Sequence, residues 1–408
     1  MHKKRILFCG NGLSCEIIKT LKDSYEIFMI SDFSNDIGIE YVDKLIIAES
    51  KNPEAALKAA IELSEQGYTF DAVLSLCWDS GMSVSKIAEH FGLPSVPFDV
   101  SYRSTIKSLR SKIFEDNNIP APKYKLSTSK NDFLSKIKEI GLPVVLKPVN
   151  LSSSKGVILL EKMSELENAY NYCTGFAKSQ DVIINEYIEG VEYSTEGLMV
   201  KGKYYMTGIS ERVFHYQKCK PLFVEIGDIM PTLLSEDEIS KFSEVTEKAA
   251  LALGITDGVA KGDLIYTNKK EIKVFEITPR LGGPRFGTEM IPLSNGTDIL
   301  RAAIQQALGE EINMDYLKIK FNRGMVNWSI FPNPGKIKSV RGLDEIKNMP
   351  GYYDFKWWGV RTLRIGDIIP KPENMCGGVG YIIATGQNRE EAILNANNIE
   401  KKIIIETE

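Results

Sequence analysis

The sequence predicts a protein of mixed α/β and α+β class that contains two or three domains. At 408 residues the chain is longer than one typical domain. Its first hundred residues alternate apolar strand patterns with amphipathic helix patterns, which is typical of an open parallel sheet. From about residue 191 the strand patterns lengthen and follow one another directly, which favours antiparallel pairing.

The first unit, residues 1–103, has the pattern of a doubly wound sheet. Strands are predicted at 5–10, 25–32 and 70–76, and helices at 12–23, 52–67 and 83–92. Pro94 and Pro97 then interrupt this alternation, and we place a domain boundary there.

The middle unit, residues 104–312, mixes helices with strands of both kinds. Helices are predicted at 104–117, 132–141, 165–178 and 235–253, and strands at 143–148, 157–161, 181–188, 192–200, 203–210, 264–267 and 272–277. The remaining residues, 313–408, are predicted to form a smaller α/β unit that is rich in Gly and Pro at 331–336 and 376–381. No internal repeat is present.

Composition points to an ordinary cytoplasmic protein. Hydrophobic residues make up 43% and charged residues 25%, and the net charge of −4 argues against a nucleic-acid-binding surface. No apolar run is long enough to span a membrane, and the basic start leads into a strand pattern rather than a signal peptide. The six cysteines show no CxxC pairing, so we expect neither a disulfide framework nor a zinc site.

Residues 258–283 contain the most informative pattern in the chain. A strand pattern at 264–267 follows Asp263, and a second at 272–277 contains Glu276. If these strands pair as a hairpin, the two carboxylates lie side by side and need a divalent cation or a basic partner to offset their repulsion. Their oxygen atoms suit Mg²⁺ bound to nucleotide phosphates, and the nearby Arg280 suits an anionic substrate. The alternative is a surface hairpin whose charges face solvent.

A second pattern suits the rest of a nucleotide. Lys107 lies near the start of a predicted helix, and Lys147 lies near the end of the strand at 143–148. The small residues of 149–156 allow backbone N–H groups and hydroxyls to approach phosphate oxygens, and Lys155 could add charge. After the strand at 181–188, backbone groups and Glu192 could bind adenine and ribose. Each piece alone is also consistent with a flexible turn or with ordinary surface acids.

Taken in order, these segments resemble the ATP-grasp enzymes. The resemblance is carried by Lys107…Pro120, PVVLKPVNLSSSKGV, INEYIEGVEY, GVAKGD and FEITPRLGG, and it extends to about residue 310. Residues 380–397 are also similar to the trailing domain of biotin-carboxylase-like members. The resemblance implies a Rossmann-like N-terminal domain (1–103), a two-part ATP-grasp domain (104–312, with the phosphate loop in subdomain 120–190) and a small α/β C-terminal domain (313–408).

The resemblance also implies ATP with Mg²⁺, or Mn²⁺ in its place, and it assigns roles to individual residues. The residues expected to contact the nucleotide phosphates are Lys107, Lys147, Ser152, Ser154 and Lys155. Those expected to contact the adenine are Glu186, Tyr187 and Ile188, and Glu192 is expected to contact the ribose. The expected metal ligands are Asp263, Glu276 and Thr278. Arg280 and Lys147 are expected to act in catalysis, and Arg280, Gly282 and Gly283 to hold the substrate.

Two positions depart from the family pattern. The family usually has Asn where this chain has Thr278, and many members have His where it has Lys261. A hydroxyl can still ligate Mg²⁺ or hold a water, so magnesium binding remains the expectation.

Four features outside these motifs are further candidates. Residues 10–15, GNGLSC, with Asp32 after the second strand, suggest dinucleotide binding, but the third glycine of that fingerprint is Cys15. Asp79 ends a strand and is expected to cap the following helix or to contact substrate. His215 lies in a basic, aromatic loop that could fold over a bound acid, although a lone loop His is usually solvated. Cys219 lies in the same loop, but the reaction needs no nucleophile.

The function implied by the resemblance is that of an ATP-dependent ligase. It would activate a carboxylate as an acyl phosphate and condense it with an amine, as amino-acid ligases do. We expect small-molecule substrates, no nucleic-acid or membrane partner, and a homodimer. Two alternatives stay open: a carboxylase-type enzyme using bicarbonate, although a biotin-type carrier motif is absent from this sequence, and a nucleotide-binding regulatory protein.

Overall fold

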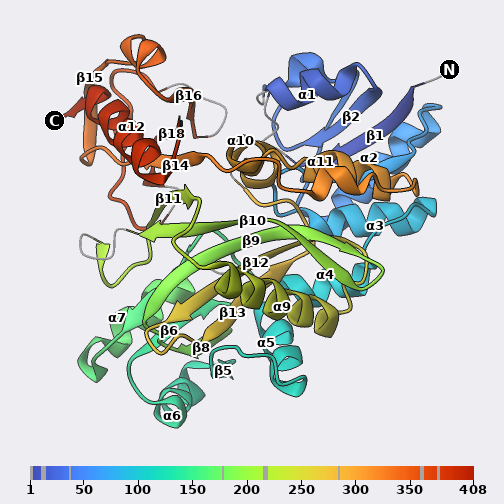
Figure 1. The fold of residues 1–408 in the computed structure, drawn as a ribbon. Helices are drawn as coiled ribbons and strands as arrows, with labels where there is room; N and C mark the ends of the chain where they lie inside the picture. The colour runs from blue at the N-terminus through green and yellow to red at the C-terminus, as the bar shows by residue number, and fades with distance from the viewer. Residues whose placement is uncertain are drawn as a thin grey trace.

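A computed structural model describes residues 3–10, 15–35, 38–176, 179–214, 219–283, 285–358, 363–374 and 377–408. It has the mixed α/β architecture that the sequence predicts (Figure 1). Four sheets are present among these residues, and the largest crosses the middle of the molecule.

The N-terminal sheet is parallel, as predicted, with the strand order β3-β2-β1-β4. Its elements are β1 (Lys4–Cys9), α1 (Cys15–Lys22), β2 (Tyr25–Ser31), β3 (Lys44–Ile47), α2 (Pro53–Glu65), β4 (Ala72–Leu74) and α3 (Gly81–Phe91). Helix α2 begins where its pattern predicts, because Asn52 accepts N–H groups of the first turn and Pro53 needs no N–H partner there. The short edge strand β3 was not predicted.

Two helices, α4 (Phe98–Thr105) and α5 (Lys107–Asp116), lead to a small antiparallel sheet of order β5-β8-β6-β7. Its elements are β5 (Tyr124–Ser127), α6 (Lys130–Ile140), β6 (Val144–Pro148), β7 (Ile158–Leu160), α7 (Leu166–Gly175) and β8 (Val182–Glu186). Figure 1 places this sheet at the opposite end of the molecule from the N-terminal sheet.

The large sheet has eight strands in the order β13-β12-β9-β10-β11-β14-β18-β16. Its central elements are β9 (Gly190–Val200), β10 (Lys203–Phe214), β11 (Glu225–Met230), α9 (Glu236–Leu253), β12 (Gly258–Thr267) and β13 (Ile272–Thr278). Helix α9 begins with a capping box between Ser235 and Glu238, and its buried side, which includes Phe242 and Leu253, shares a core with the sheet. Strand β11 was not predicted.

After β13, the chain forms a short π-helix (Phe286–Met290), α10 (Ile291–Asn295) and α11 (Ile299–Ala307). The C-terminal residues supply β14 (Gly324–Ile330), β15 (Gly335–Arg341), β16 (Tyr352–Trp357), β17 (Ile368–Ile369), β18 (Gly380–Gly386), α12 (Arg389–Lys402) and β19 (Ile404–Thr407). Three of these strands extend the large sheet, and β17-β15-β19 form a separate one.

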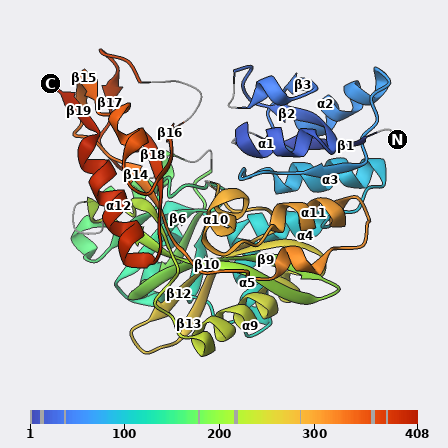
Figure 2. The same ribbon diagram turned by 45° about the horizontal axis from the view of Figure 1, so that its top comes forward.

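The N-terminal sheet lies on the right and the C-terminal residues with α12 lie on the left in Figures 1 and 2. One apolar core joins Ile6 and Leu74 of the N-terminal sheet to Leu281 and to Ile299 of α11. The segment after β13 therefore lies against the N-terminal sheet. No helix of the described ranges is long and apolar enough to cross a membrane.

Candidate active site

The predicted carboxylate hairpin is confirmed. Strands β12 and β13 pair antiparallel, and Asp263 lies directly opposite Glu276. Two steps along the same ladder, Thr278 lies opposite Lys261. Because side chains two residues apart in a strand share a face, these four side chains lie on one side of the hairpin.

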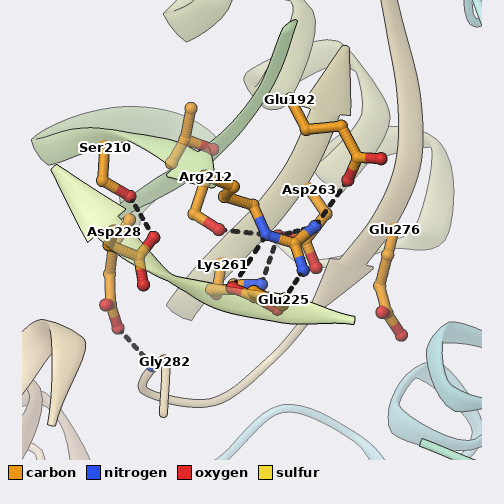
Figure 3. Close-up of polar contacts among 12 residues, drawn as sticks. Glu192, Ser210, Arg212, Glu225, Asp228, Lys261, Asp263, Glu276 and Gly282 are labelled. Carbon is orange, nitrogen blue, oxygen red and sulfur yellow. Dashed lines mark hydrogen bonds and ion pairs between the residues drawn. The ribbon is translucent and has the colours of Figure 1, made fainter. Parts of the chain in front are cut away.

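Asp263 is buried among groups that stabilise its ionised form (Figure 3). Its Oδ1 contacts Lys261 Nζ, accepts a hydrogen bond of 2.7 Å from the Ser194 hydroxyl, and lies 3.5 Å from Arg212 Nη1. Burial alone would raise the pKa of Asp263, but the charges of Arg212 and Lys261 outweigh it and hold this pKa below its usual value. Asp263 is therefore a carboxylate at neutral pH.

Glu276 has its own basic partner. Its Oε1 accepts a hydrogen bond of 3.2 Å from Nη1 of Arg110, a buried residue of α5. Burial would raise the pKa of Glu276, and the charges of Arg110 and Lys107 lower it below its usual value. Arg110 was not recognised in the sequence, because nothing local to a helical Arg shows that it faces a strand 166 residues away.

The residues of this face fit a magnesium ion that also binds phosphate. The Thr278 hydroxyl is buried and has no hydrogen-bond partner among the described residues, so its oxygen is available to a ligand. Within the described part of the chain, no three or more Asp, Glu, His or Cys side chains are grouped as a metal site. Mg²⁺ is commonly held by only one or two carboxylates, with phosphates and waters as the other ligands. The donor set is sufficient on that basis.

Arg212 of β10 connects the acids of neighbouring strands (Figure 3). It binds Glu225 with two hydrogen bonds, of 2.6 and 3.2 Å, and donates a third, of 2.9 Å, to Glu192. Burial raises the pKa of Glu192, although the charge of Arg212 opposes this shift. The predicted ribose acid therefore sits in an ion pair in the ligand-free protein, and its contact with ribose stays a prediction.

Strand β11 carries two acids that no local sequence pattern marks. Besides Glu225, it carries Asp228, whose Oδ1 accepts a hydrogen bond of 2.7 Å from Ser210 of β10. Burial, and secondarily the charge of Glu225, raises the pKa of Asp228 to about 7. No local motif marks this strand, and only its pairing with β10 places its acids near Arg212.

The two predicted phosphate lysines are both surrounded by protein. Lys107 opens α5 and its Nζ donates to the Leu151 backbone oxygen, while Lys147 of β6 lies 5.0 Å from the centre of the Phe275 ring on β13. Burial lowers the pKa of Lys107 to about 8 and also lowers that of Lys147, while Glu276 partly opposes the first shift and Glu192 the second. Both lysines thus lie near the acids of the large sheet.

The serine-rich loop has the backbone of a tight turn. Ser153 and Ser154 have φ of 59° and 56°, and Gly156 has φ of 71°. A Cβ on Gly156 would come within 2.7 Å of Pro148 Cγ and 2.9 Å of the Cys173 oxygen, so this position requires glycine. Ser152 and Lys155 are exposed at the turn, and their predicted phosphate contacts are not tested by this ligand-free structure.

The predicted adenine segment begins at the last residue of β8. The Glu186 carboxylate binds Lys273 at 2.8 Å and the Lys123 N–H at 3.0 Å, while the Tyr187 N–H donates to Pro143 at 3.2 Å. Glu186 thereby joins the small sheet to β13. Ile188 is half-buried beside it. The adenine contact of these three residues remains a prediction.

Arg280 lies where the segment after β13 meets the N-terminal sheet. Its guanidinium pairs with Asp79, which also lies 3.5 Å from Lys51 Nζ and hydrogen-bonds to the Ser152 hydroxyl. Burial would raise the pKa of Asp79, but Arg280 and Lys51 hold it well below its usual value. Our expectation that Asp79 caps α3 was wrong: the cap residue is Ser80, and no side chain closes that helix end.

The glycine pair after Arg280 is closely packed. The Gly282 N–H donates a hydrogen bond of 2.8 Å to Glu196, and a Cβ on Gly283 would come within 2.7 Å of the Cys77 oxygen. Local sequence patterns do not mark Glu196, because it is one of several polar residues in its strand.

Several candidates fall outside the part of the chain that the structure describes. These are His215 and residues 11–14 of the glycine-containing loop. Gly10 itself is described: with φ of 111°, it packs against Trp78, whose ring atom Cδ1 would lie 2.4 Å from a Cβ at this position. Packing of Trp78 explains this glycine without a dinucleotide. Cys9, Cys77 and Cys173 are free thiols.

Comparison with known proteins agrees with this arrangement. Residues 140–288 match the ATP-grasp domain family, and residues 327–408 match L-amino acid ligase C-terminal domain 2. The uncharacterized protein y4rH of Sinorhizobium fredii is 26% identical over 337 residues, which is 81% of this chain and 67% of that protein. Alanine–anticapsin ligase of Bacillus amyloliquefaciens is 24% identical over 292 residues, which is 64% of this chain and 60% of that enzyme.

The fold has a solved counterpart over its whole length. The crystal structure of L-amino acid ligase from Bacillus licheniformis superposes with a TM-score of 0.83 at 21% identity, covering 100% of this chain and 99% of that one. Residues 140–288 of this chain therefore form an ATP-grasp domain, and residues 327–408 form the C-terminal domain found in L-amino acid ligases.

Proposed function

We propose that the protein is an ATP-dependent carboxylate–amine ligase that joins an amino acid or a similar small carboxylate to an amine. The observation that carries this proposal is the pairing of Asp263 with Glu276 directly before Arg280. Two ionised acids thus lie close to the half-buried Arg280, whose charge interacts with that of Glu276, as a reaction between a nucleotide phosphate and a carboxylate requires. The alanine–anticapsin ligases among its relatives support the same class of reaction.

ATP would lie between the small sheet and the large sheet. Lys107 and Lys147 come from the small-sheet side of the site, and both feel the charge of Glu276 on β13. We infer that they hold the nucleotide phosphates together with Ser152, Ser154 and Lys155. We also infer that Glu186, Tyr187 and Ile188 contact the adenine, and that Glu192 contacts the ribose.

Asp263, Glu276 and Thr278 would hold Mg²⁺, and Mn²⁺ could replace it because both ions accept oxygen ligands. When bound, the ion supplies neutralisation of the charge on the transferred phosphoryl group. The protein's own contribution is to keep both carboxylates ionised through Arg212, Lys261 and Arg110.

The carboxylate of the substrate would bind Arg280 and the backbone of Gly282 and Gly283. One carboxylate oxygen attacks the γ-phosphorus of ATP in line, the bond to the β-phosphate oxygen breaks, and ADP leaves. The amine nitrogen then attacks the acyl carbon of the resulting acyl phosphate. Inorganic phosphate leaves, the nitrogen loses a proton, and an amide remains. Arg280 stabilises the negative charge that develops in both steps, and Lys147 stabilises the negative charge on the phosphoryl oxygens.

The test is ADP release from magnesium-ATP against amino acids and small carboxylates, alone and in pairs, with mass spectrometry of the products. ADP release that depends on a pair and yields a condensed product supports the ligase. ADP release that depends on bicarbonate would favour the carboxylase alternative. ATP binding without turnover across the whole matrix would favour a regulatory protein.

Four broader expectations belong to this proposal. We propose that the protein is cytoplasmic, forms a homodimer, acts on small molecules and uses His215 to bind its substrate. Light scattering during gel filtration tests the dimer, and His215→Ala tests the contact through the KM of the carboxylate substrate.

A further inference from the structure

Glu196 is a fully buried acid in the middle of the large sheet. It lies on β9, where its register partners are Lys261 on β12 and Gly208 on β10. Its side chain is 0% exposed. Acids are rarely buried to this extent without a specific partner, so its contacts are informative.

The carboxyl group of Glu196 reaches the segment that follows β13. Oε1 accepts the hydrogen bond from the Gly282 N–H at 2.8 Å. A Cβ on Gly287 would lie 2.6 Å from Oε1, and a Cβ on Gly282 would lie 3.0 Å from Oε2. The carboxyl group of Glu196 therefore fits only because positions 282 and 287 are both glycine.

The second oxygen, Oε2, is buried and has no hydrogen-bond partner among the described residues. Burial raises the pKa of Glu196 to about 7, and the Gly282 N–H and the charges of Lys261 and Arg280 only partly oppose this. Cys77 and Tyr204 also lie close enough to feel its charge. A buried acid with one unpaired oxygen destabilises the fold, so its presence suggests a role in the site.

Such a role follows from where Gly282 lies, two residues after Arg280. The segment is fixed at one end by the Arg280 N–H, which bonds to the Thr278 oxygen at 3.0 Å. The Arg280 side chain donates to the Leu281 oxygen at 2.9 Å and pairs with Asp79. The bond from Gly282 to Glu196 fixes the other end.

We propose that Glu196 is a positioning residue of the ligase reaction, which holds the Gly282 N–H and so directs Arg280 at the carboxylate being activated. This inference rests on the proposed function. Glu196 does not touch ATP or substrate, because its carboxyl group is enclosed by the backbone of Gly282 and Gly287. It acts through the backbone on Arg280.

The test compares Glu196→Ala with Glu196→Gln. The alanine variant loses the acceptor for Gly282, so kcat should fall and the KM of the carboxylate substrate should rise, lowering kcat/KM about 100-fold. The Kd of ATP should stay unchanged. The glutamine variant keeps a carbonyl oxygen for the same N–H and should return kcat/KM to within about threefold of the wild type. If the alanine variant does not fold, Glu196→Asp replaces it, because its shorter side chain draws the acceptor away from Gly282.

Glu247→Ala is the matched control. Its carboxylate also accepts a backbone N–H, from Tyr204 at 2.7 Å, but it lies on α9 outside the site. This variant should lose stability without a change in kcat or KM. Equal losses of kcat/KM in Glu196→Ala and Glu196→Gln, or wild-type kinetics in Glu196→Ala, would overturn the positioning role.

A crystal structure of Glu196→Ala separates this inference from the proposed function. If the wild-type protein shows no pair-dependent ADP release, the proposed function fails. The crystal structure of the variant alone then decides whether Glu196 positions Arg280. Displacement of Arg280 and Gly282 would support it. An unmoved segment, with the Asp79 pair intact, would overturn it.

Discussion

The affinity of the protein for ATP should weaken above about pH 8 because of Lys107. Burial lowers the pKa of this lysine to about 8 in the free protein. Below that pH Lys107 is charged and attracts phosphate oxygens, and above it the lysine becomes neutral. ATP binding should therefore weaken as pH rises.

The size of this effect follows from the charged fraction of Lys107. With a pKa of about 8, that fraction is about 0.9 at pH 7 and about 0.1 at pH 9. If only the charged form binds ATP, the apparent Kd equals the intrinsic Kd divided by this fraction, so it should rise about tenfold over the interval. The stability of the protein should change in the opposite direction. Between about pH 8 and 10.5 this lysine binds more protons in the unfolded chain than in the folded protein, so the free energy of unfolding should increase as pH rises.

Isothermal titration calorimetry with magnesium-ATP at pH 7, 8 and 9 measures the apparent Kd directly. Lys107→Arg is the matched variant, because arginine stays charged over the whole range and should remove most of the pH dependence. Lys147→Arg controls for the second predicted phosphate lysine. The same Kd at pH 7 and pH 9 in the wild type, or the same pH dependence in Lys107→Arg, would refute the reasoning.

Three other substitutions test the site. Glu276→Gln should lower ADP formation by at least about 100-fold through loss of a metal ligand, whereas Glu271→Gln at the exposed hairpin turn should not; substantial turnover in the former would remove Glu276 from the metal site. Arg280→Ala should raise the KM of the carboxylate substrate and lower kcat, with little change in the Kd of ATP; a change confined to ATP binding would contradict its substrate role. Gly156→Ala should cost about 1–2 kcal/mol from its positive φ and more from its collisions. Gly92→Ala, with φ of 67° and no atom within 4 Å of the new Cβ, isolates the first cost. Equal losses of Tm in these two variants would show that the collisions at Gly156 are relieved.

Elements with strong local signals were predictable from the sequence. Helix α9 has a capping box at Ser235 and an αL glycine at its end, and the hairpin that pairs Asp263 with Glu276 has two clear strand patterns. Strand β11 was missed because its six residues contain a glycine and two acids, which do not alternate with apolar residues as a typical strand does. The edge strand β3, four residues long, gives too short a pattern.

Contacts between distant strands were not predictable. Arg212 binds Glu192, Glu225 and Asp263 only because β10 lies between β9 and β11, and strand order is a tertiary property that local patterns do not encode. The same limit affected residues 313–408. They were expected to form a separate unit, yet β14, β16 and β18 continue the large sheet. The boundaries at 103/104 and 312/313 remain predictions.

The basic residues around the hairpin explain how two adjacent acids remain ionised in the free protein. Asp263 would repel Glu276 across the ladder, and burial would favour protonation of both. Arg212 and Lys261 offset this at Asp263, and Arg110 does so at Glu276. These cations do not act alike towards a metal ion. Lys261 contacts Asp263 Oδ1 itself, so a divalent cation at that oxygen must displace the ammonium group, whereas Arg212 lies 3.5 Å away and can stay. At the proposed metal site, Lys261 therefore competes with the metal ion for Asp263. Metal affinity would then depend on how readily the lysine leaves Asp263 and contacts the phosphates instead.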